Sequence, residues 1–355
     1  MRLIDRYIGH AILRYSSLVF VVLMGIFLFM VFIEELADVG VGSYDLIDVI
    51  RFVVLSAPLI AYQTFPMVAL IGSILGLSSL ASGSELIIVR ASGVSMARIT
   101  LSVLKIGAFF MITLILIGEF VNPWSESEAQ RGRAESLQRS MEQSNSFGLW
   151  IRDGNKYINI GQVLPDLTLL QIRIFEVDEG RRLVSMQQAE RGLYQDNGWD
   201  LFELRETLIG INGESTTRLS KQFSWSTDIT PEMLSDFLIT PDRLSIRQLS
   251  KYTDYLTNNG QDPRSYQLAY WQKIILPMST AAMLVLSIPF VFGSLRSGTM
   301  GRNLFIGIMA GLLFHTMNKA FGYIVLGYGV PPFWGAILPT ASLFLLAFTL
   351  YRRVG

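Results

Sequence analysis

The sequence predicts an α-helical membrane protein of six spans, arranged three and three around an inserted all-β domain. Six strongly apolar stretches occur at 11–33, 53–80, 99–121, 272–293, 303–326 and 334–350. Most of them reach the ~20 residues that a helix needs to cross ~30 Å of hydrocarbon. One long polar block, 122–270, separates the third stretch from the fourth, and its middle has the hydrophobic period of strands.

Composition supports this fold class. Hydrophobic residues make up 51% of the chain and charged residues only 16%, whereas a soluble protein typically carries about 25% charged residues. There is no cysteine, so we expect the insert to fold without disulfides, and the compartment cannot be read from redox chemistry. An insert of this size can bury enough apolar surface without covalent links.

The first stretch, 11–33, is expected to be retained rather than cleaved. Its apolar run is longer than the roughly 7–15 residues of a signal peptide, and no small-x-small cleavage site precedes Glu34. Arginine is concentrated on one side of the spans, at Arg2, Arg6, Arg14, Arg90, Arg98, Arg296, Arg302, Arg352 and Arg353. The positive-inside rule then places both termini in the cytoplasm and the 122–270 block outside the inner membrane.

The segment 82–93, between the second and third spans, is the best candidate for a docking element. Glu85 lies near the start of a short predicted helix, where the helix dipole favours an anion. Leu86, Ile87 and Val89 form an apolar side that is too short to span the bilayer and must pack against something. Two interpretations are open: a helix that docks on a cytoplasmic motor, or a simple interfacial hairpin.

The insert begins as a polar helix over 122–147 and then changes period. Leu170, Ile172 and Ile174 alternate with Gln171, Arg173 and Phe175, which predicts a short strand. Turn signals separate the strands at Asp153-Gly154-Asn155, Asp178-Glu179-Gly180, Asp196-Asn197-Gly198 and Asn212-Gly213. Short strands at this spacing are typical of an all-β sandwich or open barrel.

The end of the insert predicts a short capped helix from Thr240-Pro241 to Asn259-Gly260, and a further helix that starts after Asp262-Pro263 and leads into the fourth span. The insert contains neither histidine nor cysteine, and the sequence places no close pair of carboxylates in it. A binding or docking module is therefore favoured over a catalytic domain.

Ionisable residues in the spans are costly and suggest function. His315, Asn318 and Lys319 have i, i+3, i+4 spacing and share one helix face, while Arg51 and Lys273 begin the second and fourth spans. Together they could meet an anionic headgroup; snorkelling and helix–helix hydrogen bonding are the simpler explanation for each one alone.

Three further patterns have low specificity. The acidic residues from Glu34 to Asp48 predict a negative outer face, or less favourably a divalent-cation site. Gly72-x-x-x-Gly76 and Gly307-x-x-x-Gly311 permit close helix packing. The loop 293–298 lacks the lysine of a phosphate-binding loop, so any ATP-driven motor must be another polypeptide.

Several motifs in order make the chain resemble the LptF/LptG family, the paired permease subunits of the lipopolysaccharide export transporter. These motifs are Leu3-Ile4-Asp5-Arg6-Tyr7-Ile8-Gly9, Gly42-Ser43-Tyr44-Asp45, Ser84-Glu85-Leu86, Ala91-Ser92-Gly93, Asp153-Gly154-Asn155, Gly260-Gln261-Asp262, Phe292-Gly293-Ser294-Leu295-Arg296 and Tyr328-Gly329-Val330-Pro331-Pro332. The resemblance covers essentially the whole chain. The first two motifs are more similar to the G type than to the F type.

The resemblance implies domains at 1–121, 122–270 and 271–355, with the insert a periplasmic β-jellyroll, in the inner membrane of a Gram-negative bacterium. It implies a homologous LptF-like permease, a dimeric LptB-like ATPase, a bitopic LptC-like bridge protein and lipopolysaccharide as partners, and no nucleic acid. The chain itself is then not an enzyme and binds no cofactor, since ATP and Mg belong to the ATPase.

The resemblance also assigns roles to residues. The segment 82–93 becomes the coupling helix, with contacts to the ATPase from Glu85, Leu86, Ile87, Val89 and Arg90. Lipid enters laterally between helices one and five, so the residues expected at the cavity and headgroup are Phe27, Phe32, Arg51, Lys273, Ile308, His315, Lys319 and Phe321. The stretches 31–38 and 58–61 lack the lysines that the family carries there, so the cations must come from elsewhere in this chain or from its partner.

Two other classes of membrane protein share some of these features. A mechanotransmission permease of the macrolide-exporter type also has a large external domain, but between helices one and two of four. A membrane-embedded lipid transferase or protease needs clustered catalytic residues, and His315 with Lys319 is too small a set.

Overall fold

The computed structural model of the chain describes residues 3–137, 149–163, 168–178, 180, 182–195, 198–210, 214–225, 227, 229–231, 240–292 and 300–354. Within these residues, six helices are long and apolar enough to cross a membrane, which confirms the six predicted spans. They are α1 (Leu3–Leu36), α2 (Leu46–Ser82), α4 (Met96–Leu116) with its continuations η1 (Ile117–Val121) and α5 (Asn122–Ser136), α9 (Arg264–Phe292), α10 (Met300–Tyr328) and α11 (Pro332–Val354). Helices pair their backbone groups internally, which is the condition for crossing hydrocarbon.

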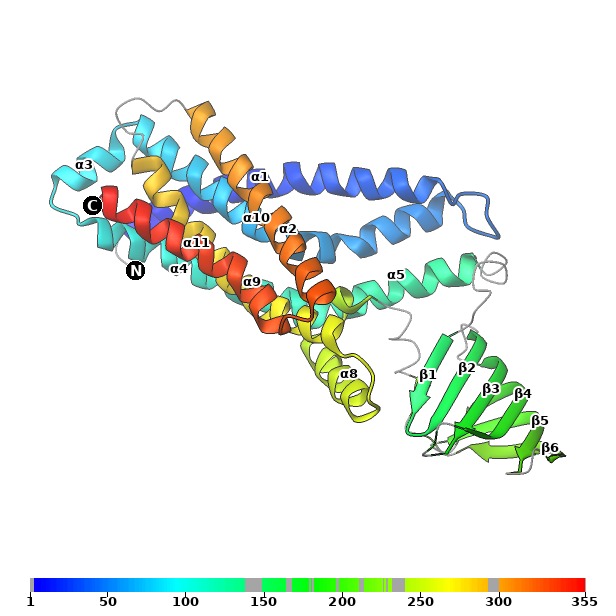
Figure 1. Cartoon of the computed structure of the whole chain (residues 1–355). Helices are drawn as coiled ribbons and strands as arrows, with labels where there is room; N and C mark the ends of the chain where they lie inside the picture. The colour runs from blue at the N-terminus through cyan, green and yellow to red at the C-terminus, as the bar shows by residue number, and fades with distance from the viewer. Residues whose placement is uncertain are drawn as a thin grey trace.

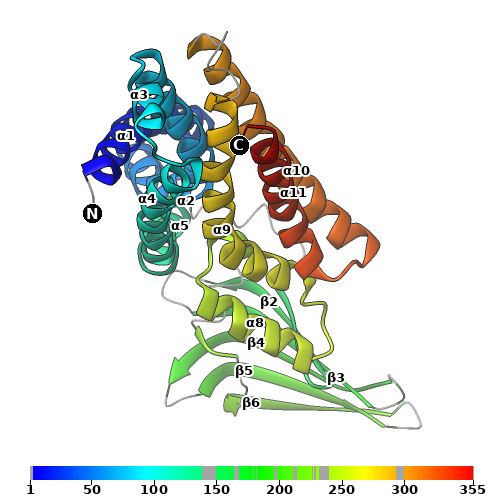
Figure 2. The same cartoon turned by 90° about the vertical axis from the view of Figure 1, so that its left-hand side faces the viewer.

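The molecule has two distinct ends (Figures 1 and 2). Both chain termini and the short helix α3 (Glu85–Ala91) lie at one end, which we call the terminal end. The β domain lies at the other, which we call the insert end. Figure 1 shows the α1–α2 hairpin and α5 reaching past the ends of α9, α10 and α11 toward the insert end.

Helix α2 is the centre of the membrane domain, with α1 on one side and α10 on the other. A Cβ at Gly72 of α2 would lie 2.3 Å from the Ser16 Oγ of α1. A Cβ at Gly307 of α10 would lie 2.9 Å from a methyl group of Ile74 of α2. The second glycine of each motif also lies against the facing helix. Both glycine pairs therefore permit the close helix packing that their spacing predicts.

The third span continues beyond its apolar stretch as one helix that contains a π-helical turn. α4 passes directly into η1 and then α5, which confirms the helical start of the insert as far as Ser136; residues 138–148 lie outside the described part. At Gly118, in the π-helical turn, an added Cβ would lie 2.5 Å from the Tyr62 ring of α2. The predicted domain boundaries at 121/122 and 270/271 both lie within continuous helices, and the division itself stays a prediction.

At the insert end, the loop between α1 and α2 is fastened to α5. Arg133 donates to Glu35 over 2.9 Å and to Asp38 over 2.5 Å. Tyr44 donates to the same Glu35 oxygen over 2.9 Å, and its burial together with this hydrogen bond raises the pKa of the phenol. Asp45 caps the start of α2. The predicted acidic stretch thus uses its carboxylates to hold an arginine and to cap a helix.

At the terminal end, one fully buried carboxylate fastens α1 to α4. Asp5 accepts hydrogen bonds from Ser102 and Lys105, each over 2.6 Å, and from Arg98 over 3.2 Å. These three donors lie four and three residues apart, on one face of α4. A buried charge is costly unless it is paired, so the cluster fixes the start of α1 against α4.

The insert forms one antiparallel sheet whose strand order follows the chain. Its strands are β1 (Leu149–Asp153), β2 (Lys156–Val163), β3 (Leu169–Val177), β4 (Leu183–Gln195), β5 (Gly198–Ile209) and β6 (Ser215–Trp225). The register is that of consecutive hairpins, with Ile158 of β2 opposite Ile174 of β3. The all-β insert is confirmed; within the described residues it is a single, strongly twisted meander (Figure 2).

One face of the sheet carries the core of the insert, around the fully buried Trp199, whose Nε1 donates to the Ile229 carbonyl over 2.8 Å. The predicted strand is confirmed as β3, in which Leu169, Ile172 and Ile174 are buried and Leu170 is only partly buried. Gln171 has a φ of 53°, and beside it the buried positions pass from Leu169 to Ile172 while the pairing register with β2 and β4 continues unbroken.

The predicted turn at Asp153-Gly154-Asn155 is confirmed, with Gly154 at a φ of 60° between β1 and β2. The other three predicted turns include residues outside the described part, namely 179, 196–197 and 211–213, as does the loop 293–298. The strands that flank them still pair as hairpins.

The chain returns to the membrane through η2 (Pro241–Arg243) and α8 (Ile246–Asn258). The predicted capped helix is present, but it begins at Ile246 rather than beside Pro241, with Ser245 and Gln248 forming its capping box, because residues 241–243 form a separate 3-10 turn. Asp262 accepts from the Arg264 backbone N–H over 3.0 Å where α9 begins, as expected.

Candidate functional site

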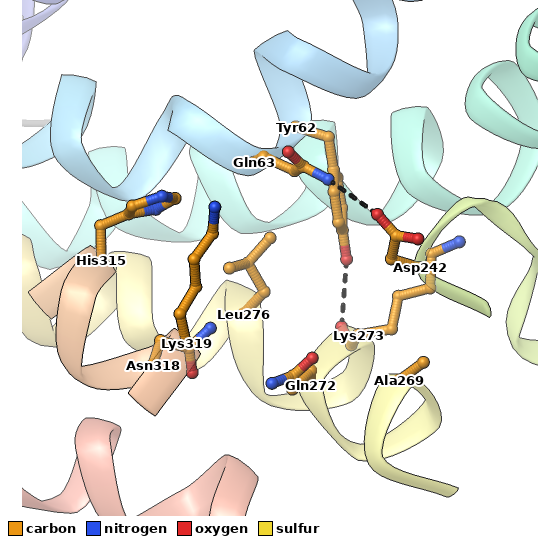
Figure 3. Close-up of a pocket in the computed structure, with 10 residues that line it drawn as sticks. All are labelled: Tyr62, Gln63, Asp242, Ala269, Gln272, Lys273, Leu276, His315, Asn318 and Lys319. Atoms are coloured by element: carbon orange, nitrogen blue, oxygen red, sulfur yellow. Dashed lines mark hydrogen bonds between the residues drawn. The ribbon is translucent and has the colours of Figure 1, made fainter. Parts of the chain in front are cut away.

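A polar pocket lies at the insert end of the membrane domain, bounded by α2, α9 and α10 with η2 as its fourth wall (Figure 3). Its volume is about 200 Å³, and it is lined by Tyr62, Gln63, Asp242, Ala269, Gln272, Lys273, Leu276, His315, Asn318 and Lys319. This volume lies below the roughly 300–1,000 Å³ of pockets that enclose drug-sized ligands. The pocket therefore fits a phosphate group or part of a sugar headgroup rather than a whole multi-acyl lipid.

One face of α10 supplies the accessible polar groups of the pocket. His315, Asn318 and Lys319 all line it, in agreement with their predicted shared face. Figure 3 shows the Lys319 ammonium extended toward the His315 ring. Both side chains are exposed, so Lys319 is a cation that a ligand can reach.

Lys273 lines the same pocket but is held differently. The residue is only 6% exposed, and its ammonium donates to the Leu244 carbonyl at the end of η2. Its nitrogen lies 5.9 Å from the centroid of the Tyr62 ring, and Tyr62 in turn donates to the Lys273 carbonyl over 3.2 Å. This ammonium is thus bonded to the backbone, whereas Lys319 is exposed.

The charges of the lining residues favour an anion. Lys273 and Lys319 supply two positive charges, and Asp242 supplies one negative charge and accepts from the Gln63 amide over 3.4 Å. A phosphate oxygen beside Lys319 would gain a charge-assisted hydrogen bond, with amide donors available from Asn318 and Gln63.

Arg51 is not part of this pocket. It lies about three turns earlier on α2 than Tyr62 and faces a separate shallow hollow of about 420 Å³ with Trp124 and Glu128 of α5. The structure therefore brings together Lys273, His315 and Lys319 of the predicted headgroup set, and places Arg51 apart from them.

The predicted apolar cavity residues lie on the two helices that flank α2. Phe27 and Phe32 are partly buried on α1, and Ile308 and Phe321 are exposed and partly buried on α10. Their neighbours on the same helices are largely exposed, as with Phe29 at 61% and Phe305 at 64%. Within this chain the two groups lie on opposite sides of α2, so they do not form an enclosed cavity by themselves.

The second predicted site, around α3, is connected to the start of α1. The Tyr7 hydroxyl donates to Glu85 over 2.5 Å. Leu86 is fully buried and Val89 partly buried against α1 and α2, beside a hollow of about 280 Å³. Ile87 is 48% exposed, so the apolar side predicted from the sequence is only partly covered.

The end of α3 faces outward from the bundle. Ile88 is 65% exposed and Arg90 is exposed, with its guanidinium 5.8 Å from the Phe292 ring centroid. Exposed apolar and basic side chains on so short a helix are available for contact with another protein.

Sequence reasoning missed several residues of both sites. Gln63 and Asp242 line the pocket from 179 positions apart along the chain, a distance over which sequence gives no signal. Gln272 also lines the pocket; its position beside Lys273, as a polar residue at the start of a span, is the signal that could have identified it. Tyr7 belongs to the Asp5-Arg6-Tyr7 motif, which was used only for the resemblance.

The fold and the two sites define a polytopic membrane protein with a β domain inserted between its third and fourth spans. Residues 6–353 match the family described as lipopolysaccharide export system permease LptF/LptG. The chain belongs to this family of permeases.

The chain is similar to LptG proteins of other bacteria over nearly the full length of both. The chain is 36% identical to the lipopolysaccharide export system permease protein LptG of Escherichia coli strain K12 over 352 residues, which are 99% of this chain and 98% of that protein. It is 32% identical to the LptG protein of Haemophilus influenzae, again over 352 residues that make up 99% of this chain and 98% of that protein.

Proposed function

We propose that the chain is the G-type permease subunit of an ATP-driven exporter, which extracts lipopolysaccharide from the outer leaflet of the inner membrane. It passes the lipid through its β domain to a bridge across the periplasm. The observation that carries this proposal is the similarity to LptG proteins over 99% of the chain. Orientation follows the arginine distribution, with the terminal end cytoplasmic and the insert end periplasmic.

The exposed apolar faces of α1 and α10 support a lateral path for the lipid. A second six-helix permease that presented the same faces would enclose a cavity walled by these helices. Burial is worth ~0.8 kcal/mol per methylene, so apolar walls offset part of the cost of removing a multi-acyl lipid from the bilayer. The polar pocket, with Lys319 accessible, then receives a phosphate of the headgroup.

Helix α3 supports docking of a cytoplasmic ATPase dimer. Its outward residues Ile87, Ile88 and Arg90 provide the contact surface, and Glu85 adds an acidic contact. The Tyr7–Glu85 hydrogen bond then connects that surface directly to α1, one wall of the lipid path. In this role the chain does not catalyse ATP hydrolysis; ATP and Mg are bound by the partner.

Reconstitution tests the proposal. The chain is combined with an LptF-like permease, an LptB-like ATPase and an LptC-like bridge protein in liposomes that contain lipopolysaccharide. We expect ATP-dependent transfer of the lipid to a soluble acceptor built from the bridge. Transfer that is independent of ATP, or absent while all subunits are assembled and hydrolyse ATP, contradicts the proposal.

Photocrosslinking locates the path. Probes along α1 and α10 should label lipopolysaccharide, with the strongest adducts near Phe27, Phe32, Ile308 and Phe321. Adducts found only on α4 and α11 would exclude the proposed cavity. Co-purification separates the mechanotransmission alternative: a bound ATPase with no homologous six-helix partner would favour it.

A further inference from the structure

The segment through which the chain returns from the β domain, residues 240–246, is fastened to three different membrane helices. We call it the return segment. Asp242 contacts Gln63 of α2, and Leu244 contacts Lys273 of α9. The other two contacts are with the continuous helix of the third span: Arg243 with Glu126 of α5, and the Ile246 N–H with Glu119 of η1. The last of these spans 3.0 Å.

The centre of this junction is a buried ion pair that is incompletely hydrogen-bonded. Glu126 is 1% exposed, and 29% of the Arg243 side chain is exposed. One oxygen of Glu126, the Nε of Arg243 and both polar atoms of the neighbouring Asn122 have no hydrogen-bond partner in the described part of the chain. Loss of either partner would leave the other as an uncompensated charge at this buried site, so the ion pair holds Arg243 against α5.

Outward from the junction, the return segment leads into α8, which holds the sheet. The Tyr255 hydroxyl of α8 donates to the Arg152 carbonyl of β1 over 3.1 Å. The Gly154 N–H of the first hairpin donates to Asn259 over 2.9 Å. Tyr255 also packs against the core of the sheet. A movement of the return segment therefore reaches the β domain through α8.

Inward from the junction, the return segment forms part of the pocket. Asp242 is its carboxylate wall, and Lys273, which bonds Leu244, is one of its two lysines. The same two residues thus line the pocket and hold the root of the β domain.

We infer that Arg243, through its pair with Glu126, is a positioning residue for the transfer of lipid from the pocket to the β domain. It holds the return segment where an anion in the pocket can act on it. This inference rests on the proposed function and names the step at which the junction acts.

The physical reason is competition for two charged groups. A phosphate in the pocket repels the Asp242 carboxylate and attracts the Lys273 ammonium, for which it is a stronger partner than a neutral carbonyl oxygen. Both effects weaken contacts of the return segment. The anion does not compete for the Arg243–Glu126 ion pair, because this pair joins the return segment to α5 instead of to the pocket. Arg243 therefore stays attached to α5 while the rest of the return segment and α8 move about it.

The test uses the full complex with a photocrosslinking residue at either of two positions, Leu276 beside the pocket or Leu204 in the sheet core. Glu126→Gln and Arg243→Gln each remove the ion pair, whereas Glu126→Asp retains it. The matched control is Asp178→Asn, which removes an exposed ion pair in the β3–β4 hairpin. The lipid is a lipopolysaccharide with phosphorylated lipid anchor.

We expect Glu126→Gln and Arg243→Gln to leave labelling at Leu276 unchanged and to lower ATP-dependent labelling at Leu204 by about tenfold, a factor equivalent to ~1.4 kcal/mol. Glu126→Asp should restore most of that labelling, and Asp178→Asn should have no effect. Equal losses at both positions, or no loss at Leu204, overturn the inference. Absence of ATP-dependent labelling at both positions in the unmodified complex overturns the proposed function instead.

A second measurement does not depend on the ion-pair variants. Since the chain has no native cysteine, Arg173→Cys in β3 and Leu345→Cys in α11 can be spin-labelled selectively, and both positions are exposed. The distance distribution between the labels should shift when phosphorylated lipopolysaccharide is added, but not with the dephosphorylated lipid. Identical distributions for the two lipids overturn the inference.

Discussion

The first two helices are close neighbours in sequence and in space, yet they relate to the rest of the chain in opposite ways. α1 is the most apolar of the six spans, but only 17% of its most apolar stretch is buried. The corresponding stretch of α2 is less apolar and is 72% buried, because α1 and α10 pack on its two sides. In a membrane protein, hydropathy therefore indicates contact with an apolar environment and does not distinguish lipid from protein.

α10 sharpens this difference. It is as little buried as α1, at 17%, yet it is the least apolar of the six spans. Its polar residues at 315, 318 and 319 gather at the pocket. Polar side chains on a membrane helix are costly in contact with lipid tails, so their clustering on one face of α10 indicates a binding site.

The largest expected effect tests the packed side of the comparison. Gly72→Leu places a side chain where even a Cβ would lie 2.5 Å from the Ser16 backbone, so we expect a loss of about 3 kcal/mol or more in stability. Gly25→Leu on α1 is the matched control, because a Cβ there meets nothing within 4 Å. Thermal unfolding in detergent measures both. Equal destabilisation would contradict the central position of α2.

The next effect concerns how so exposed a helix as α1 is held in place. Asp5→Asn leaves Arg98 and Lys105 without their carboxylate, and we expect a loss of about 2 kcal/mol, less than for a fully buried pair because both cations are partly exposed. Hydrogen exchange should increase in the first turns of α1. If thermal stability and exchange match those of Asp178→Asn, Asp5 is not the anchor of α1.

A smaller effect separates α10 from α1 as a ligand-binding helix. Lys319→Gln removes the accessible ammonium, and we expect roughly tenfold weaker binding of a phosphorylated lipid, since charge-assisted hydrogen bonds contribute ~1.5–3 kcal/mol. Lys319→Arg retains the charge and should bind nearly normally. Binding of a fluorescent lipopolysaccharide to the purified complex measures this. No preference between the two variants would remove Lys319 from the site.

The smallest effect on stability is expected at the terminal end. Tyr7→Phe removes the hydrogen bond to Glu85; because Tyr7 is 55% exposed and water can replace that bond, the stability of the protein should hardly change. Lipid-stimulated ATP turnover of the assembled complex should nevertheless fall several-fold. Tyr351→Phe on α11 is the control. Unchanged turnover in Tyr7→Phe would show that α3 acts on the bundle without α1.

The sequence was sufficient where one local rule dominates. Hydrocarbon thickness sets the minimum length of an apolar span, so the six spans could be found from apolar run length alone. The i, i+3, i+4 spacing placed His315, Asn318 and Lys319 on one face. Each of these features depends on residues within a few positions of one another.

The sequence was insufficient where contacts join distant segments. Arg243 and Glu126 are 117 positions apart, and no local pattern pairs them. Lys273 and Lys319 were both predicted as cations for a headgroup. In the structure, the Lys273 ammonium is bonded to a backbone carbonyl, whereas the Lys319 side chain is exposed. In β3, Gln171 has a positive φ and the buried residues on its two sides are Leu169 and Ile172, a spacing that simple alternation along the strand does not indicate.

The π-helical turn η1 has a consequence for the phase of the third helix. Each residue advances an α-helix by about 100°, so the extra residue that a π-helical turn accommodates rotates all later side chains by that angle. Glu126 and Arg133 both follow the turn, seven residues apart on one face, and each meets a partner from another part of the chain. In an uninterrupted α-helix both would point about a quarter-turn away from those partners. The one π-helical turn thus determines which face of α5 points toward Arg243 and Glu35.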